Sequence, residues 1–126
     1  MWRSLVARVC AELDRYTQGG PVIAPMTLLR REYADEIFEA LAKDGVEVHH
    51  LLLHSDSDIL RSRIEGSMEF PDDEECSEKV RAFRRRRLAD YETAYATWLG
   101  EQAEVIDTTG LTPEQVLARA LTLLGP

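Results

Sequence analysis

Apolar positions along the chain follow the period of a helix in some segments and form short continuous runs in others. The first helical stripe consists of Trp2, Leu5, Val6, Val9, Leu13 and Tyr16, at spacings of three and four. This spacing predicts a helix over 2–17 with one buried face. The same criterion predicts helices over 31–43, over about 78–99 and over 113–124. Gly45 follows the second of these in the position usual for the end of a helix.

The last helix has the best-defined start. Thr112 stands at the expected N-cap, Pro113 at the first helical position, and Gln115 three residues after the cap. Together they form a capping box with proline at its preferred place. A weaker version, Ser55-x-x-Asp58, predicts a helix that carries Ile59, Leu60 and Ile64.

Three short apolar runs between these helices predict strands, at 22–26, 46–54 and 103–107. Gly19-Gly20-Pro21 precedes the first run and separates it from the first helix. Strands that alternate with amphipathic helices are typical of a parallel sheet with right-handed crossovers. The sequence therefore predicts an α/β fold in three layers, with a short parallel sheet of about three strands and flanking helices.

Length and composition narrow the class of protein. The chain has 126 residues, 44% of them hydrophobic and 30% charged, which is typical of a single soluble domain over 1–126. The formal net charge of −8 argues against nucleic acid as a partner, and no apolar run is long enough to cross a membrane. The two cysteines lie far apart in no metal-binding spacing, so we expect a reducing compartment, the cytoplasm.

Side chains that suit ligand binding follow each predicted strand, and ligands of open parallel sheets bind beyond the carboxyl ends of the strands. The first group is Thr27, Arg30, Arg31 and Tyr33; the second is His54, Ser55 and Asp56; the third is Asp107, Thr108, Thr109 and Gly110. The first group suits an anionic or polyhydroxyl substrate, because guanidinium groups match phosphate and carboxylate geometry. The alternative is that Thr27 caps the next helix and the arginines are solvated.

Arginines are dense on both sides of an acidic segment, 66–78, whose composition predicts an exposed mobile loop. Arg61 and Arg63 precede it, and the run Arg84–Arg87 follows it. In one interpretation the acidic and basic groups neutralise each other within the chain. In the other, the loop is a lid that brings arginines onto a phosphoryl group during its transfer.

Two further groups of residues carry weaker predictions. His49 and His50 are adjacent on a strand and point to opposite faces, whereas His50 and His54 share one face at some distance. A zinc site would need a carboxylate or cysteine from elsewhere in the chain, and no spacing supports one, so we do not predict a metal site. Asp35 and Asp56 are the candidates for a general base, and each is equally well explained as a helix-end or surface carboxylate.

Three segments resemble the last strand units of P-loop kinase-like proteins: VIAPMTLLRREYADEIFEAL, VHHLLLHSDSDILRSRIE and VIDTTGLTPEQVLARAL. They are most similar to the tunicamycin-resistance ATP-binding protein family, and gluconate and adenylylsulfate kinases resemble them more distantly. The resemblance implies an ATP-dependent phosphotransferase, acting in antibiotic resistance or on another small-molecule acceptor, with Mg²⁺ and ATP as cofactors.

The resemblance also implies roles for particular residues. Thr27, Arg30, Arg31 and Tyr33 would bind the acceptor substrate, and Asp107, Thr108, Thr109 and Gly110 would border the adenine. Arg61 and Arg63, with the loop 66–78, would cover the phosphates. We take Arg61, Arg63 and Asp35 as the candidate catalytic residues, and expect no metal ligand among the side chains.

The chain departs from that family in one essential motif. It has no G-x-x-x-x-G-K-[ST] sequence, whose backbone N–H groups and lysine hold the nucleotide phosphates. We therefore expect an N-terminally truncated, C-terminal part of the fold that by itself binds ATP poorly. The alternative is a non-enzymatic module that binds a small ligand or forms a homodimer through open strand edges.

Overall fold

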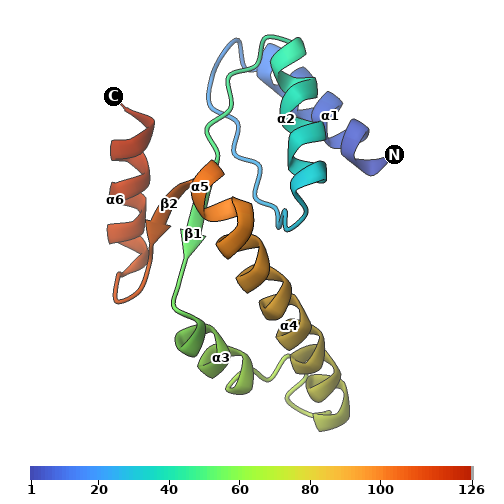
Figure 1. Ribbon diagram of the computed structural model, residues 1–126, viewed down its shortest axis with the longest axis vertical. Helices are drawn as coiled ribbons and strands as arrows, with labels where there is room; N and C mark the ends of the chain where they lie inside the picture. Colours follow the sequence, from blue (N-terminus) through green and yellow to red (C-terminus); the bar gives the residue numbers. More distant parts are fainter. Residues whose placement is uncertain (126) are drawn as a thin grey trace. The chain divides into compact units, whose positions relative to one another are not determined.

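The computed structural model describes residues 1–125, which divide into two compact units. The first unit comprises Met1–His49, and the second begins at His50. Figure 1 shows the elements of both units, coloured along the sequence. Each unit has its own buried apolar residues.

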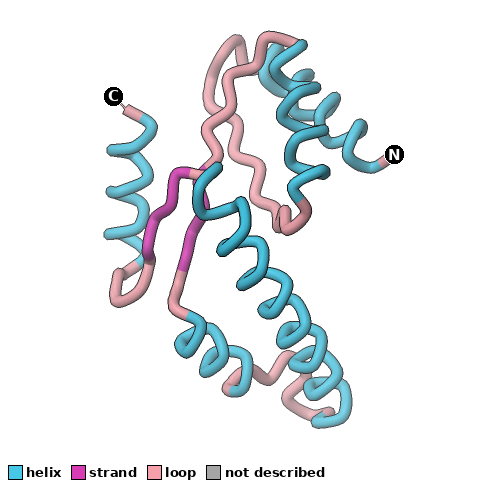
Figure 2. The backbone as a smooth tube through the Cα atoms, viewed as in Figure 1, coloured by secondary structure: helices cyan, strands magenta, loops and turns pink. Residues whose placement is uncertain are grey.

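The first unit is a pair of helices, α1 (Trp2–Tyr16) and α2 (Arg31–Lys43), joined by a long loop (Figures 1 and 2). The residues buried in this unit are Ala7, Ala11, Leu28, Ala34, Ile37 and Leu41. The bounds predicted for both helices are confirmed to within one residue at either end. Gly45 follows α2 with a positive φ of 74°, a conformation that glycine adopts without strain.

The predicted buried face of α1 is wrong. Trp2, Leu5, Val9, Leu13 and Tyr16 are all exposed, with Leu5 at 60% and Tyr16 at 85%. The buried residues of α1 are Ala7 and Ala11, and of the large apolar residues Trp2 meets Tyr33 of α2 edge to face, with ring centroids 5.8 Å apart. A helical period in the sequence identifies an apolar stripe, but it does not say which neighbouring element covers that stripe.

The predicted strand at 22–26 is also wrong, because this segment is an irregular loop. Val22, Ile23 and Met26 are exposed, Ile23 at 89%. A strand exists only through hydrogen bonds to a neighbouring strand, and no neighbour pairs with this segment among residues 1–125. The segment therefore meets the local criterion for a strand, an apolar run bounded by turn residues, but no neighbouring strand is present to pair with it.

The second unit contains the sheet, a parallel pair of strands, β1 (Leu51–His54) and β2 (Glu104–Asp107). Leu51 lies opposite Glu104, and His54 lies opposite Asp107. The predicted α/β class and parallel pairing are confirmed, but the sheet described over 1–125 has two strands rather than about three. The strand predicted over 46–54 is shorter at its start, and the one predicted over 103–107 agrees to within one residue.

Between the two strands the chain forms α3 (Ser57–Glu65), α4 (Glu74–Ala94), a π-helical turn η1 (Tyr95–Leu99) and the short α5 (Gly100–Gln102) (Figure 1). Leu88, Ala94, Trp98 and Leu99 are buried here with Ala103 and Ile106. The helical period places Phe83 on the inward face, but its side chain is 54% exposed. The other large apolar residues of that face are at least half-buried.

Helix starts in this unit differ in how well the sequence predicts them. At α6 (Pro113–Leu124) the capping box of Thr112 and Gln115 is formed as predicted. At α3 the predicted box is wrong, because the N-cap is Asp56 and no side chain caps it. The acidic loop is shorter than predicted: α4 already begins at Glu74, where the Asp73 carboxylate accepts a hydrogen bond from the Cys76 backbone N–H at 3.0 Å.

Candidate functional site at the carboxyl ends of β1 and β2

The carboxyl ends of β1 and β2 lie side by side, because the two strands are parallel and His54 is in register with Asp107. Two of the three groups predicted to follow strands therefore meet at one edge of the sheet. These groups are His54–Asp56 after β1 and Asp107–Gly110 after β2. This edge is where open parallel sheets bind ligands, and we take it as the candidate site.

Hydrogen bonds join the two segments beyond the strands. The backbone N–H and the hydroxyl of Thr108 both donate to the carbonyl oxygen of His54, at 2.7 and 2.8 Å. The backbone N–H of Asp56 donates to the Thr109 hydroxyl at 3.2 Å. The hydroxyl of Ser55 is buried and has no hydrogen-bond partner among residues 1–125. The two threonines thus hold the start of the turn after β2 against the end of β1.

Asp107 is fixed by the turn that follows it. Its Oδ1 accepts a hydrogen bond from the backbone N–H of Thr109 at 3.0 Å. This bond holds the pKa of the Asp107 carboxyl below its usual range. Gly110 closes the turn with a positive φ of 73°, where a side chain would strain the backbone. Asp107 is therefore an ionised, exposed carboxylate in a defined position.

Two tyrosines that the sequence did not suggest as site residues lie against His54. The Nδ1 atom of His54 is hydrogen-bonded to the Tyr91 hydroxyl at 2.5 Å. The His54 ring is stacked on the Tyr95 ring, with centroids 4.2 Å apart and an angle of 7° between planes. The spacing of four residues between the tyrosines places them on one helix face, but that signal does not distinguish a site from a core.

The environment of Tyr91 keeps its hydroxyl protonated. Burial raises the pKa of Tyr91 to about 12, and the nearby Tyr95 and Asp107 act in the same direction. Tyr95 is also the first residue of the π-helical turn η1. Although π-helical turns are rare in proteins, many of those that occur lie at functional sites.

The candidate catalytic arginines lie on α3 in different surroundings. Arg61 is held by carboxylates: its Nη2 lies 2.8 Å from Glu92 Oε1, and its Nη1 lies 3.6 Å from Asp58 Oδ1. Arg63 is exposed, and its side chain makes no hydrogen bond or ion pair with residues 1–125. Arg63 is thus the better placed of the two for an anion from outside.

Arg81 of α4 is a buried cation that joins the loop after α3 to the first turns of α4. It is 7% exposed and donates to the Ser67 carbonyl oxygen at 3.0 Å. Its guanidinium also bonds the carboxylates of Glu74 and Glu78. A buried cation in this position is matched by two carboxylates and one backbone acceptor.

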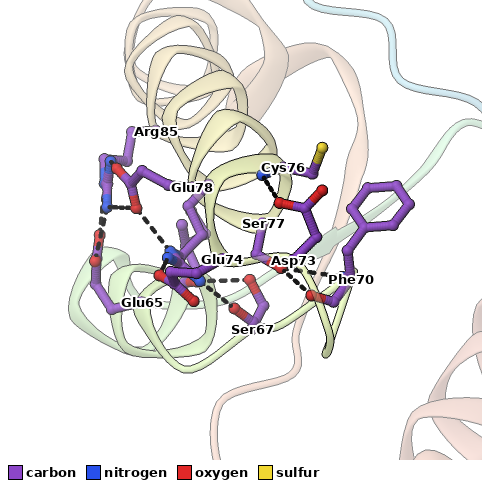
Figure 3. Close-up of polar contacts among 11 residues, drawn as sticks. Glu65, Ser67, Phe70, Asp73, Glu74, Cys76, Ser77, Glu78 and Arg85 are labelled. Carbon is purple, nitrogen blue, oxygen red and sulfur yellow. Dashed lines mark hydrogen bonds and ion pairs between the residues drawn. The ribbon is translucent and has the colours of Figure 1, made fainter.

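Three other arginines of α4, Arg84, Arg85 and Arg87, pair with carboxylates at the surface. Arg85 bonds Glu65 and Glu78, which links α4 to the end of α3 (Figure 3). The remaining pairs are Arg84 with Glu69 and Arg87 with Asp90. The interpretation that acidic and basic groups neutralise each other within the chain is therefore confirmed for these arginines. Their carboxylate partners lie between Glu65 and Asp90 and are not confined to the acidic segment 66–78.

Residues predicted to bind the acceptor lie in the first unit, around the start of α2. Thr27 is exposed in the loop, and Arg30 is the N-cap of α2. Arg30 Nη1 donates to the Tyr33 hydroxyl at 3.3 Å, and its guanidinium lies 5.3 Å from the Tyr33 ring centroid. Arg31 Nε lies 3.8 Å from Asp35 Oδ2. Thr27 does not cap α2, because no side chain does.

Arg3 is a further cation that the sequence analysis did not place in this group. Its guanidinium lies 4.1 Å from the Tyr33 ring centroid, and it is paired with Glu36. Two arginines, Arg3 and Arg30, therefore contact the Tyr33 ring in cation–π arrangements. The only sequence signal for a role of Arg3 at Tyr33 is that Arg3 stands next to an aromatic residue, Trp2.

The part of the chain that the structure describes contains no metal-binding group and no membrane-spanning helix. Within residues 1–125, no His, Cys, Asp or Glu side chains gather in a group of three that could hold a metal ion, and no helix is long and apolar enough to cross a membrane. Comparison with known proteins found no matching family model, no matching curated protein and no matching solved structure. A functional proposal therefore rests on the site and the sequence.

Proposed function

We propose that this chain forms part of an ATP-dependent phosphotransferase that acts on a small molecule, in antibiotic resistance or a related pathway. In this proposal it supplies the sheet edge that borders the nucleoside and the residues that bind the acceptor. The resemblance of three segments to kinase-like proteins motivates the class. The site geometry supports the part played by the sheet edge.

One observation carries the proposal: the polar turns after β1 and β2 are joined by the bonds of Thr108 and Thr109. The joined turns offer a carboxylate, an imidazole and backbone groups at the edge where parallel sheets bind ligands. In the proposal, Asp107–Gly110 borders the adenine of ATP. Arg63, which has no partner among residues 1–125, contacts a phosphate, whereas Arg61 is occupied by Glu92.

The acceptor role is assigned to the start of α2. Arg30 and Arg31 place guanidinium groups beside Tyr33 and Asp35, and such groups match carboxylate and phosphate oxygens. Thr27 adds a hydroxyl, and Asp35 is the candidate base. Two free cysteines, both half-buried, fit a reducing compartment, so we place this activity in the cytoplasm.

In this proposal the chain binds Mg-ATP about as weakly as it binds adenosine. The chain lacks the glycine-rich loop that binds the phosphates of ATP, so Mg-ATP gains little affinity over adenosine. The test is a titration of the labelled chain with adenosine and with Mg-ATP, followed by backbone amide NMR. We expect shifts confined to Asp107–Gly110 and neighbouring residues, with a Kd on the order of 1 mM for both ligands.

Either of two results would contradict the proposal. One is the absence of amide shifts at Asp107–Gly110 at about 10 mM adenosine, well above the expected Kd. The other is micromolar binding of Mg-ATP, which would require a phosphate site that the sequence does not contain. Gly110→Ala, which strains the turn, is the matched variant and is expected to abolish the shifts.

A second candidate function is an interaction module that forms a homodimer. The exposed apolar stripe of α1, which includes Leu5, Val9 and Leu13, favours it, since exposed apolar patches often mark interfaces. Each strand of the sheet also has one edge that is unpaired within residues 1–125. Light scattering after size exclusion distinguishes the candidates: a discrete dimer held by the α1 stripe would be lost in the double variant Leu5→Ser, Val9→Ser.

A further inference from the structure

His54 and Asp107 share one face of the sheet. They are register partners on neighbouring parallel strands, and partners in such a ladder point to the same side at a strand spacing of about 4.8 Å. Hydrogen bonds with Thr109 lower the pKa of the Asp107 carboxyl, and His54 lowers it further. The sheet thus presents an imidazole and a carboxylate side by side.

The surroundings of His54 determine which of its nitrogens is open to a ligand. Tyr91 occupies Nδ1, and Tyr95 covers one face of the ring. The Tyr91 hydroxyl keeps its proton because burial raises its pKa, so it can donate to Nδ1. A neutral imidazole whose Nδ1 accepts a hydrogen bond carries its own proton on Nε2. The ring then offers one N–H donor in a fixed plane.

The charges directly beside His54 and Asp107 disfavour an anion at that position of the edge. Asp107 and Asp56 are exposed carboxylates, and a phosphate placed beside them would be repelled. Arg61 on α3 is taken up by Glu92 and Asp58. Arg119 of α6 offsets part of the charge of Asp107. A neutral group that both donates and accepts hydrogen bonds fits this combination best.

We propose that His54 and Asp107 form a binding site for a pair of neighbouring hydroxyl groups, the diol of a ribose or of a free sugar. The Nε2–H of His54 donates to one hydroxyl oxygen, and the carboxylate of Asp107 accepts from the other. Tyr91 and Tyr95 are positioning residues: the first sets the tautomer of His54 and the second sets the plane of its ring. The inference rests on the proposed function only in the choice of adenosine as one source of the diol.

The tautomer is measured first, on the full chain labelled with nitrogen-15 in histidine, at pH about 8.5, where an ordinary imidazole is neutral. We expect the ring nitrogens of His54 to show the Nε2–H form. Tyr91→Phe keeps the ring but removes the donor, and is expected to mix the two tautomers. Tyr95→Phe keeps the stacked ring and is the matched control, expected to leave the tautomer unchanged.

Binding is then measured by titration with adenosine, dideoxyadenosine and methyl glucoside, followed at the His54 ring signals. Adenosine or methyl glucoside is expected to shift these signals, and dideoxyadenosine, which lacks the diol, is expected to bind at least about fivefold more weakly than adenosine. Asp107→Asn and Tyr91→Phe are each expected to weaken diol binding by about fivefold, and Tyr95→Phe by less than about twofold.

The outcomes separate this inference from the proposed function. Binding of methyl glucoside without adenosine supports the diol site and contradicts the nucleoside role; binding of adenosine alone supports both. Equal binding of adenosine and dideoxyadenosine overturns the diol site and leaves the nucleoside role intact. An Nδ1–H tautomer of His54, or no ring shift with any of the three probes, overturns the inference.

Discussion

The guanidinium of Arg81 on α4 donates a hydrogen bond to the backbone carbonyl oxygen of Ser67, 3.0 Å away in the loop that leaves α3. The same side chain bonds Glu74 and Glu78. One buried cation therefore joins the loop to the first turns of the following helix. This arrangement opposes free movement of the loop between α3 and α4, the segment that one interpretation of the sequence makes a lid.

Removing that cation is expected to loosen the loop. In Arg81→Ala, the Ser67 carbonyl and Glu74 lose their donor and Glu78 keeps only Arg85, so backbone amides of residues 66–73 should exchange with solvent about tenfold faster. Hydrogen exchange followed by mass spectrometry measures this. Arg86→Ala removes an exposed arginine of the same run and should leave exchange unchanged. Equal exchange in both variants would contradict a structural role for Arg81.

Ser77 makes a second connection between α4 and the same loop. Its side chain is 1% exposed; the hydroxyl donates to the Phe70 carbonyl oxygen at 2.8 Å and accepts from the Phe70 N–H at 3.0 Å. Ser77→Ala leaves both groups without that partner, and we expect the free energy of unfolding to fall by about 2 kcal/mol. Urea unfolding is the measurement, and Ser62→Ala on the exposed surface of α3 is the control. An equal, small change in both variants would show that the Ser77 bonds do not stabilise the fold.

Acid is expected to weaken the ion pairs around Glu78. Hydrogen bonds from Arg85 and Arg81 lower the pKa of Glu78 to about 2 from a usual value of 4.5. Because the folded-state pKa is depressed, the stability that Glu78 contributes is present above pH 4.5 and is lost as the pH falls toward 2. Urea midpoints of the wild type and Glu78→Gln should therefore differ at neutral pH and converge near pH 2. Midpoints that differ equally at both pH values would contradict this.

A high pH is expected to remove the contribution of Tyr91 to the stability of the fold. Burial raises its pKa from 10.0 to about 12, so the protonated phenol stabilises the fold below pH 10, and this contribution is lost as the pH rises from 10 to 12. Thermal unfolding followed by circular dichroism should show a smaller loss over this range in Tyr91→Phe than in the wild type. Absorbance titration of the wild type should show one tyrosine ionising near pH 12, and an identical loss in both proteins would argue against this role of burial.

The helices were largely predictable, because their signals are local. The capping box of Thr112 and Gln115, the glycine after α2 and the helical period over 31–43 all depend on residues within one or two turns. The pairing of β1 with β2 followed from the alternation of apolar runs with helices. Because parallel strands end at the same edge of a sheet, this pairing alone places His54 and Asp107 at one edge.

The errors came from features that depend on distant parts of the chain. The segment 22–26 has the composition of a strand but no ladder to join within residues 1–125. The apolar stripe of α1 is present, but Ala7 and Ala11 are the buried residues of this helix, whereas Leu5 and Leu13 are exposed. Tyr91 and Tyr95 became site residues only because α4 and η1 pass beside the end of β1, a placement that no local pattern encodes.

The central claim is that the joined turns after β1 and β2 border a nucleoside, and one titration tests it most directly. Backbone amide NMR of the full chain with adenosine and then Mg-ATP should show shifts centred on Asp107–Gly110, with a similar Kd on the order of 1 mM for both. Gly110→Ala should remove them. Shifts elsewhere, or no shifts at all, would contradict the claim.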